Sequence, residues 1–287
     1  MIDLALSVLC STLIFVIFKL FEVYQVQTLY AIIVNYIVAF LTGFILDQNS
    51  GSLIDTYKET WFMASLFLGI FFILVFNIMA RSAQVNGVGV TSVATKMSLV
   101  IPVIFAVVVY GDRLSTFQDI GILMALGAVY LSAIGQKKGE LVSRKLWLPI
   151  LVFLGSGIID TSIKYFQDQY LDDGSFAIFS STVFGAAAIS GMFFIILSKK
   201  GNGLKVNFKN VLGGVCLGVP NFFSIFFLLR ALNQPRMNSS AIFTINNVSI
   251  VLFSTIFGLL LFKEKLSKQN WLGVIMAIIS IVLVAMF

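Results

Sequence analysis

Residues 156–164 read Ser-Gly-Ile-Ile-Asp-Thr-Ser-Ile-Lys, and residues 11–19 read Ser-Thr-Leu-Ile-Phe-Val-Ile-Phe-Lys. The two stretches begin with Ser, end with Lys and lie 145 positions apart. Three matches in the same chain order indicate an internal duplication of the chain. The other two are Leu68-Gly69 and Arg81 with Leu217-Gly218 and Arg230, 149 positions apart, and Asp-Arg-Leu-Ser at 112–115 with Glu-Lys-Leu-Ser at 264–267, 152 positions apart.

The composition is that of a membrane protein. Hydrophobic residues make up 59% of the 287 positions and charged residues 11%, which lies outside the range of soluble globular domains. A run of about 20 apolar residues can cross the hydrocarbon core of a bilayer as a helix. The sequence contains ten such runs, at 2–20, 27–46, 61–80, 88–110, 117–135, 147–166, 174–197, 210–232, 238–262 and 269–286.

Each copy of the duplication holds five of these runs. Because five is odd, the second copy enters the membrane in the opposite direction from the first, which makes an inverted repeat. We therefore predict an all-α integral membrane protein with ten transmembrane helices, arranged as two inverted five-helix repeats. The first repeat is expected at 1–137, a short basic linker at 138–146 and the second repeat at 147–287. An even number of spans puts both termini on the same side.

The residue types restrict the chemistry. The sequence contains no histidine, which excludes histidine-ligated metals and nucleophiles activated by histidine. Cys10 and Cys216 both fall inside apolar runs, where we expect them to be buried apolar side chains. We therefore predict no enzyme activity, no metal and no cofactor. The basic residues lie in loops beside a bilayer, so we expect no binding to nucleic acid.

The fourth run contains Pro102 and is followed by Gly-Asp-Arg-Leu-Ser at 111–115 and Gly-Ile-Leu-Met-Ala-Leu-Gly-Ala at 121–128. Together with the order of spans and the short loops after Arg81 and Arg230, these segments resemble the EamA-like branch of the drug/metabolite transporter superfamily. The resemblance covers essentially the whole chain. It implies a carrier of five plus five helices for small organic solutes, often an exporter of amino acids or related metabolites, in the plasma membrane, which is the inner membrane of a bacterium.

A charge inside the hydrocarbon costs at least ~2.5 kcal/mol on insertion scales, so Asp160 and Lys164 each need a reason. They lie four residues apart and therefore on one helical face, which Ser156 shares. On one interpretation this face lines a cavity, where Lys164 attracts an anionic group and Asp160 holds or releases it. On the other, Lys164 reaches the membrane interface and Asp160 neutralises it locally. Lys19 is the counterpart of Lys164 in the first repeat, with Phe15 in place of the acid.

Lys96 lies eight residues after Val88, the start of the fourth run, and no acidic residue is three or four positions away. We interpret it as a binding residue, with a structural pairing to Asp160 or to a carbonyl group as the alternative. The corresponding part of the ninth run contains Asn246 and Asn247. Both runs therefore have a polar first half and an apolar second half, the pattern expected where two symmetry-related helices border a wet central pocket.

Asn77 and Asn221 can both donate and accept hydrogen bonds, which makes them further candidates to orient a solute. The alternative for each is a hydrogen bond to a neighbouring helix, the more common role of such residues in membranes. Pro102 and Pro220 are expected to kink their helices and to free backbone carbonyl groups.

Asp112 and Glu264 are matched carboxylates of the two repeats, which invites a catalytic interpretation. Both lie in tight turns just before a Ser that can cap the next helix. Ser115 and Gln118 have the spacing of a capping box. We therefore expect a structural role for the two acids.

The predicted cavity contains Lys19, Lys96 and Lys164 against Asp160, which favours a carboxylate-bearing, zwitterionic or other anionic solute. We predict a secondary transporter that moves a small polar organic metabolite, by export, through alternating access of a site between the two halves. A passive channel and a non-transporting structural membrane subunit are the alternatives. The expected partners are the solute and the lipid bilayer, and the oligomeric state stays open.

The Lys and Arg residues are distributed unevenly around the spans. By the positive-inside rule, this distribution predicts that both termini lie outside the cytoplasm. The resemblance favours the opposite orientation, with both termini inside. The loops after the odd-numbered runs hold 13 (Lys19, Arg81, Lys137, Lys138, Arg144, Lys145, Lys199, Lys200, Lys205, Lys209, Lys263, Lys265, Lys268), and the other side holds five (Lys58, Arg113, Lys164, Arg230, Arg236).

Overall fold

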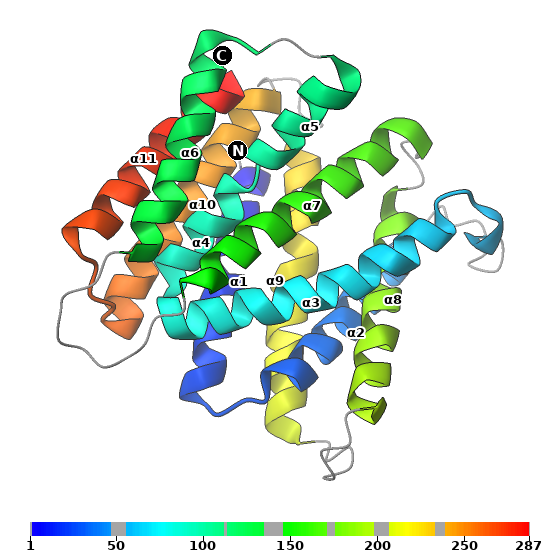
Figure 1. Cartoon of the computed structure of the whole chain (residues 1–287). Helices are drawn as coiled ribbons and strands as arrows, with labels where there is room; N and C mark the ends of the chain where they lie inside the picture. Colours follow the sequence, from blue (N-terminus) through cyan, green and yellow to red (C-terminus); the bar gives the residue numbers. More distant parts are fainter. Residues whose placement is uncertain are drawn as a thin grey trace.

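The protein is a bundle of α-helices (Figure 1). The computed structural model describes residues 2–46, 56–111, 114–134, 146–170, 176–197, 207–232 and 239–286, and these ranges contain no strand. Most of the predicted linker, 138–145, and the acid Asp112 lie outside the described residues. The helices are α1 (Ile2–Val23), α2 (Thr28–Leu46), the short 3-10 helix η1 (Thr56–Lys58), α3 (Phe62–Asn86), α4 (Val88–Met97), α5 (Val100–Tyr110), α6 (Thr116–Ile134), α7 (Trp147–Tyr170), α8 (Phe176–Leu197), α9 (Phe208–Leu232), α10 (Ser239–Phe262) and α11 (Lys268–Met286).

Eight segments of the described chain are long and apolar enough to cross a membrane. They are α1, α2, α3, the continuous α4–α5 segment, α7, α8, α9 and α10, while α6 and α11 contain shorter apolar stretches. Each coincides with one of the ten apolar runs of the sequence. The prediction of an all-α, multi-pass membrane protein is therefore confirmed.

The fourth apolar run does not form one helix. Its first helix, α4, ends at Met97, and α5 begins at Val100. Pro102 explains the break, because it has no N–H group and its ring would collide with the carbonyl of Ser98 in a regular helix. The N–H of Ile101 donates to that carbonyl instead (2.9 Å), which makes a tight turn between the two helices. Pro220, in contrast, lies inside α9, which continues to Leu232.

Matched capping boxes start α6 and α11. The N–H of Gln118 donates to Oγ of Ser115 (3.2 Å), and the N–H of Ser115 donates to Oε1 of Gln118 (2.9 Å), as the sequence predicted. The N–H of Asn270 donates in the same way to Oγ of Ser267 (3.1 Å), and the N–H of Ser267 to Oδ1 of Asn270 (3.0 Å). Both pairs satisfy backbone donors that the first turn of a helix leaves without partners.

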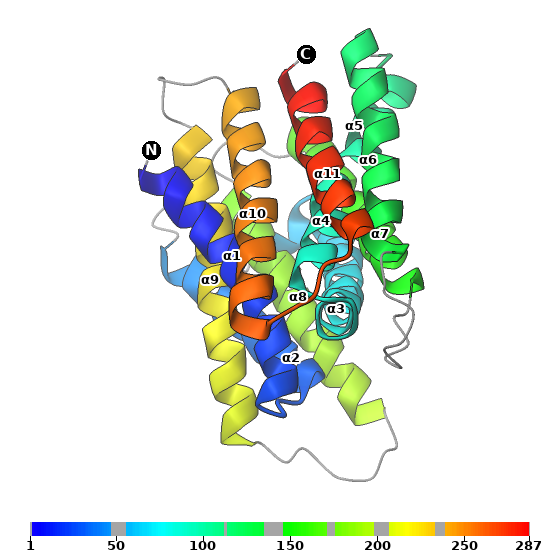
Figure 2. The same ribbon diagram turned by 90° about the vertical axis from the view of Figure 1, so that its left-hand side faces the viewer.

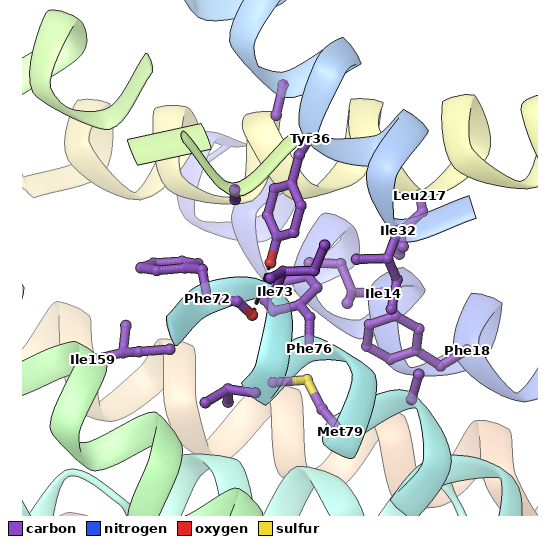
Figure 3. Close-up of a cluster of buried hydrophobic side chains, with 14 of the residues drawn as sticks. Ile14, Phe18, Ile32, Tyr36, Phe72, Ile73, Phe76, Met79, Ile159 and Leu217 are labelled. Atoms are coloured by element: carbon purple, nitrogen blue, oxygen red, sulfur yellow. Dashed lines mark hydrogen bonds between the residues drawn. The ribbon is translucent and has the colours of Figure 1, made fainter. Parts of the chain in front are cut away.

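The largest apolar core lies where α1, α2 and α3 meet (Figure 3). Phe76 of α3 contacts Phe18 of α1 and Tyr36 of α2, with ring centroids 5.7 and 5.4 Å apart. The hydroxyl of Tyr36 donates to the carbonyl of Phe72 (3.1 Å), so the buried phenol is satisfied. Side chains from the second half of the chain, including Ile159 and Leu217, join this cluster, and the core therefore unites both halves.

Contacts between the two halves occur in matched pairs. Nε2 of Gln118 in α6 donates to the carbonyl of Val284 in α11 (3.4 Å), and Nδ2 of Asn270 in α11 donates to the carbonyl of Ser132 in α6 (2.6 Å). Gln118 and Asn270 lie 152 positions apart, as do Ser132 and Val284. The donor and acceptor of one contact therefore occupy the same repeat positions as the donor and acceptor of the other, with the two halves exchanged.

Two glycines form a second matched pair. A Cβ on Gly69 of α3 would lie 2.7 Å from the carbonyl oxygen of Val183 in α8. A Cβ on Gly218 of α9 would lie 2.8 Å from the carbonyl oxygen of Asn35 in α2. Only glycine permits helix backbones to approach this closely. The interfaces between α3 and α8 and between α2 and α9 therefore have the same close approach at corresponding positions.

The start of α1 and the end of α11 lie toward the same end of the bundle (Figures 1 and 2). We call this the terminal end and the other the opposite end. The helices alternate in direction along the chain, so α3 ends and α4 begins at the opposite end, whereas α5 and α7 run toward the terminal end. The break between α4 and α5 lies between the two ends, at the depth where a transporter site is expected.

Candidate functional site

The break in the fourth run brings three polar side chains together. Oγ of Ser98, in the turn between α4 and α5, donates to Oδ2 of Asp160 in α7 (3.2 Å). Lys96, two residues earlier at the end of α4, interacts electrostatically with Asp160. The structure thus places two of the predicted site residues, Lys96 and Asp160, in one polar cluster. It also adds Ser98, which was not predicted from the sequence.

Asp160 is exposed, with one carboxylate oxygen bonded to Ser98. One helical turn earlier on the same face, Ser156 is 5% exposed, and its hydroxyl has no hydrogen-bond partner among the described residues. A buried hydroxyl without a partner costs free energy, which a bound solute could recover. The Asp160 face of α7 therefore offers a carboxylate and an unused hydroxyl to a ligand.

Lys19 and Lys164, which occupy equivalent positions in the two repeats, lie in different surroundings. Nζ of Lys19 contacts Oε2 of Glu22 (2.7 Å) and the carbonyl of Gln84 (2.5 Å), near the ends of α1 and α3. These contacts neutralise its charge at the opposite end, and the structure does not bring Lys19 to the cluster around Asp160. Lys164, one turn beyond Asp160 on α7, is exposed.

Hydrogen bonds are seen for three of the four predicted asparagines, and none of these bonds is to Asp160. Asn77 donates to the carbonyl of Ile73 in its own helix (2.7 Å). Asn221 is 4% exposed and donates to Oδ1 of Asn35, which ties α9 to α2 (3.1 Å).

The two asparagines of α10 differ from each other. Asn246 is 2% exposed and accepts a hydrogen bond from Oγ of Ser7 (3.3 Å), which connects α10 to α1. Asn247 is half-buried. Of these contacts, that of Asn221 corresponds to the alternative of a bond to a neighbouring helix, whereas the bond of Asn77 stays within its own helix.

Two grooves run between helices in the described part of the bundle, and neither is lined by Lys96, Ser98 or Asp160. One, of about 380 Å³, runs between α1 and α10 along Leu4, Val8 and Thr12 and along Ile245, Ser249 and Phe253. The other, of about 570 Å³, runs between α5 and α7 and is lined by Phe105, Thr161, Ser162 and Tyr165. The second groove lies on the side of α7 away from Asp160.

Within the described ranges, no group of three or more Cys, Asp or Glu side chains could hold a metal ion. Cys10 of α1 and Cys216 of α9 are both free thiols, the first half-buried and the second exposed. The remaining cluster of charge and hydroxyl groups is suited to reversible binding of a polar molecule.

A multi-pass helical bundle with a charged cluster at a broken span is typical of membrane transporters. Residues 145–286 match the EamA-like transporter family, and over this second half the chain belongs to that family. The family resemblance predicted from the sequence is thereby confirmed, and the chain is a membrane transporter.

Three relatives cover between 71% and 97% of the chain. An uncharacterized protein of Haemophilus influenzae is 29% identical over 287 residues, which is 97% of this chain and 96% of the relative. A glucose uptake protein of Staphylococcus xylosus is 23% identical, over 87% of this chain and 84% of its own. A probable glucose uptake protein of Staphylococcus aureus is 26% identical, over 71% and 70%.

The fold is also found in a solved structure. A crystal structure aligns with 96% of this chain and 95% of its own chain, with a TM-score of 0.59 and 14% sequence identity. This similarity shows that the whole chain adopts a known fold, and it carries no information about the solute.

Proposed function

We propose that the protein is a secondary carrier that exports a small polar organic metabolite across the plasma membrane by alternating access. The single observation that carries this proposal is the cluster of Lys96, Ser98 and Asp160 at the break between α4 and α5. A broken span frees backbone polar groups in the membrane and concentrates binding groups between the two ends of the bundle. The solute would contact these three residues and the unused hydroxyl of Ser156.

The alternating mechanism requires two similar halves, and matched contacts support an arrangement of ten spans as two inverted repeats. The hydrogen bond of Gln118 and that of Asn270 join equivalent positions of the two halves. The close helix contacts at Gly69 and Gly218 also lie at equivalent positions of the two halves. Two halves related in this manner can adopt two equivalent arrangements that open to opposite sides of the membrane.

The charges of the cluster bear on the class of solute. Lys96 and Asp160 carry opposite charges, and Glu22 neutralises Lys19 away from the cluster. The cluster therefore pairs one cation with one anion, and Lys164 adds a further cation one helical turn along α7. A zwitterionic solute fits this pair, because its carboxylate can approach Lys96 while its ammonium group approaches Asp160.

A neutral sugar is a second candidate. Two relatives that cover most of the chain are named as glucose uptake proteins, one of them as probable. Hydroxyl groups of a sugar can donate to Asp160 and accept from Lys96 and Ser156. The two candidates differ in a testable way, because the solute's own charges matter only for the zwitterion.

The test is uptake into proteoliposomes of a panel that contains a neutral α-amino acid, a dicarboxylate, glucose and a permanent organic cation. We expect the amino acid to be transported and to be lost as a substrate in Lys96→Ala. Transport of glucose alone would favour the sugar. Transport of the cation alone, with Lys96→Ala fully active, would contradict both candidates.

A further inference from the structure

The turn between α10 and α11 lies at the opposite end of the bundle (Figure 2), and we call residues 263–268 the lysine turn. It directly follows the apolar segment Ile245–Phe262, so its side chains lie at the level of the lipid headgroups. Three of its side chains are exposed cations, Lys263, Lys265 and Lys268. The acid among them, Glu264, is half-buried, and its Oε1 accepts a hydrogen bond from the N–H of Val88 (2.8 Å). The turn therefore presents positive charge to the membrane surface.

The backbone at Lys263 is unusual for a lysine. Its φ of 52° is left-handed, a conformation that costs free energy for a residue with a Cβ. Helices commonly end with such a residue, which is usually glycine. The first repeat follows this rule, because Gly111, 152 positions earlier and directly after α5, has a φ of 73°. The second repeat therefore has a lysine where the backbone favours glycine.

The two repeats also differ in the charge of this turn. Positions 111, 113 and 116 of the first repeat are Gly, Arg and Thr, and the equivalent positions of the second are Lys263, Lys265 and Lys268. A cation at the middle position is thus common to both turns, whereas Lys263 and Lys268 have no basic counterpart. The left-handed end of the helix forms with Gly111 as well, so the fold of the turn does not explain the lysine at 263.

Exposed apolar side chains lie on both sides of the lysine turn. Leu260 and Leu261, at the end of α10, are 70% and 60% exposed. Trp271 and Leu272, in the first turns of α11, are 44% and 49% exposed. Tryptophan at the end of a span is typical of the boundary between headgroups and acyl chains. Cations flanked by such side chains fit a lipid, which offers both a charged head and an apolar chain, better than a water-soluble anion.

We propose that the lysine turn is a binding site for anionic phospholipids, with Lys263 and Lys268 at the phosphate and the four flanking apolar side chains against the acyl chains. Lysines near a membrane surface attract anionic lipids, and each changes the affinity by about fivefold. The hydrogen bond of Glu264 to Val88 keeps the acid directed away from the phosphate. This site binds a component of the membrane and not the transported solute.

The test is binding of phosphatidylglycerol to the purified protein in detergent, measured by native mass spectrometry, with phosphatidylcholine in parallel. We expect the protein to prefer phosphatidylglycerol. The double variant Lys263→Gln, Lys268→Gln should weaken its binding by about 25-fold and leave that of phosphatidylcholine unchanged. Unchanged affinity of the double variant for phosphatidylglycerol would overturn the proposal. Displacement of the lipid by an equal concentration of inorganic phosphate would also overturn it, because the site would then select a soluble anion.

A matched control removes the same charge from other surfaces. Lys58 and Lys209 are both exposed, and Lys209, at the start of α9, lies at the same end of the bundle as the lysine turn. The double variant Lys58→Gln, Lys209→Gln should change the affinity for phosphatidylglycerol by less than about twofold. An equal loss in the two double variants would show attraction by net charge alone and would contradict a site at this turn.

Replacement of Lys263 by glycine separates lipid binding from folding. Because glycine adopts a left-handed φ at no steric cost, Lys263→Gly should raise the unfolding temperature in phosphatidylcholine by roughly 2–4 °C. The same variant should lose about fivefold in affinity for phosphatidylglycerol. The two effects therefore have opposite signs. A lower unfolding temperature in both lipids, with unchanged affinity for phosphatidylglycerol, would show that Lys263 serves the fold and would overturn the proposal.

Discussion

Lys96 and Asp160 are recognisable in the sequence because each is a charge within an apolar run. They lie in one cluster because the chain turns directly after Lys96. The turn at Ser98, four residues before Pro102, directs the serine hydroxyl to Asp160. Proline gives a sequence signal for such a turn. The residue that Ser98 contacts across the bundle, however, depends on how α4 packs against α7. Residue types could thus identify Lys96 and Asp160 as candidate site residues, but they could not show that Ser98 contacts Asp160.

Replacement of Lys96 by Gln tests the cation of the cluster. We expect Lys96→Gln to lower kcat/KM for a zwitterionic solute by about 10- to 100-fold, since loss of one charge-assisted contact is worth ~1.5–3 kcal/mol. The protein should still insert and fold, because removal of a charge from the membrane interior relieves an insertion cost. The control is Lys209→Gln, at an exposed position at the start of α9. Like most surface substitutions, it should change uptake by less than about twofold.

Lys19 is expected to matter for stability and not for the selection of solutes. Lys19→Met removes the contacts to Glu22 and to the carbonyl of Gln84, and Glu22 is about half exposed. We expect a loss of about 1 kcal/mol in the free energy of unfolding, with the preference among solutes of different charge unchanged. Denaturant titration in detergent and competition assays measure the two effects. A change in charge preference with unchanged stability would place Lys19 in the site after all.

At the scale of helices, apolar runs are sufficient to locate nearly every element. All ten runs coincide with helices, and the capping box of Ser115 and Gln118 forms as predicted. The division of the fourth run was not predicted as such, because a membrane proline can bend a helix without ending it. The helix ends are also less visible to hydropathy. α3 continues to Asn86, beyond the predicted end at residue 80, because its last turns are polar but packed and buried.

The matched capping boxes provide a test at the same scale. Asn270 is 1% exposed and its side chain donates to the Ser132 carbonyl at 2.6 Å, whereas the equivalent bond of Gln118 is longer, at 3.4 Å. Asn270→Ala should therefore cost about 2 kcal/mol of stability and Gln118→Ala about 1 kcal/mol. Thermal unfolding of the two variants measures the difference. A larger loss for Gln118→Ala would contradict the geometry at this interface.

For the whole molecule, the internal duplication carries most of the predictive information. The sequence pairs Gly69 with Gly218, and the structure uses both at close helix contacts. Sequence similarity between the halves cannot reveal how they differ in arrangement, because two equivalent structures share one sequence. The hydrogen bonds that join α4 to α10 and to Glu264 therefore had no signal in the residues. The boundary between the repeats lies outside the described residues and stays a prediction.

Orientation is also a property of the whole chain. The uneven distribution of Lys and Arg predicts that both termini face away from the cytoplasm. A reporter that is active only in the cytoplasm, fused after Phe287, should then be inactive, and the same reporter placed in the loop of residues 138–145 should be active. Activity at Phe287 with none at residues 138–145 would reverse the orientation.

The most direct measurement of the central claim is counterflow in proteoliposomes. Vesicles are loaded with unlabelled solute, and entry of the labelled solute is followed with the protein, with Asp160→Asn and with empty vesicles. A carrier with one alternating site should show saturable entry that is stimulated by solute on the other side, and Asp160→Asn should lose this stimulation. Entry that rises in proportion to concentration, with no stimulation from the far side and no effect of Asp160→Asn, would show a channel and contradict the account.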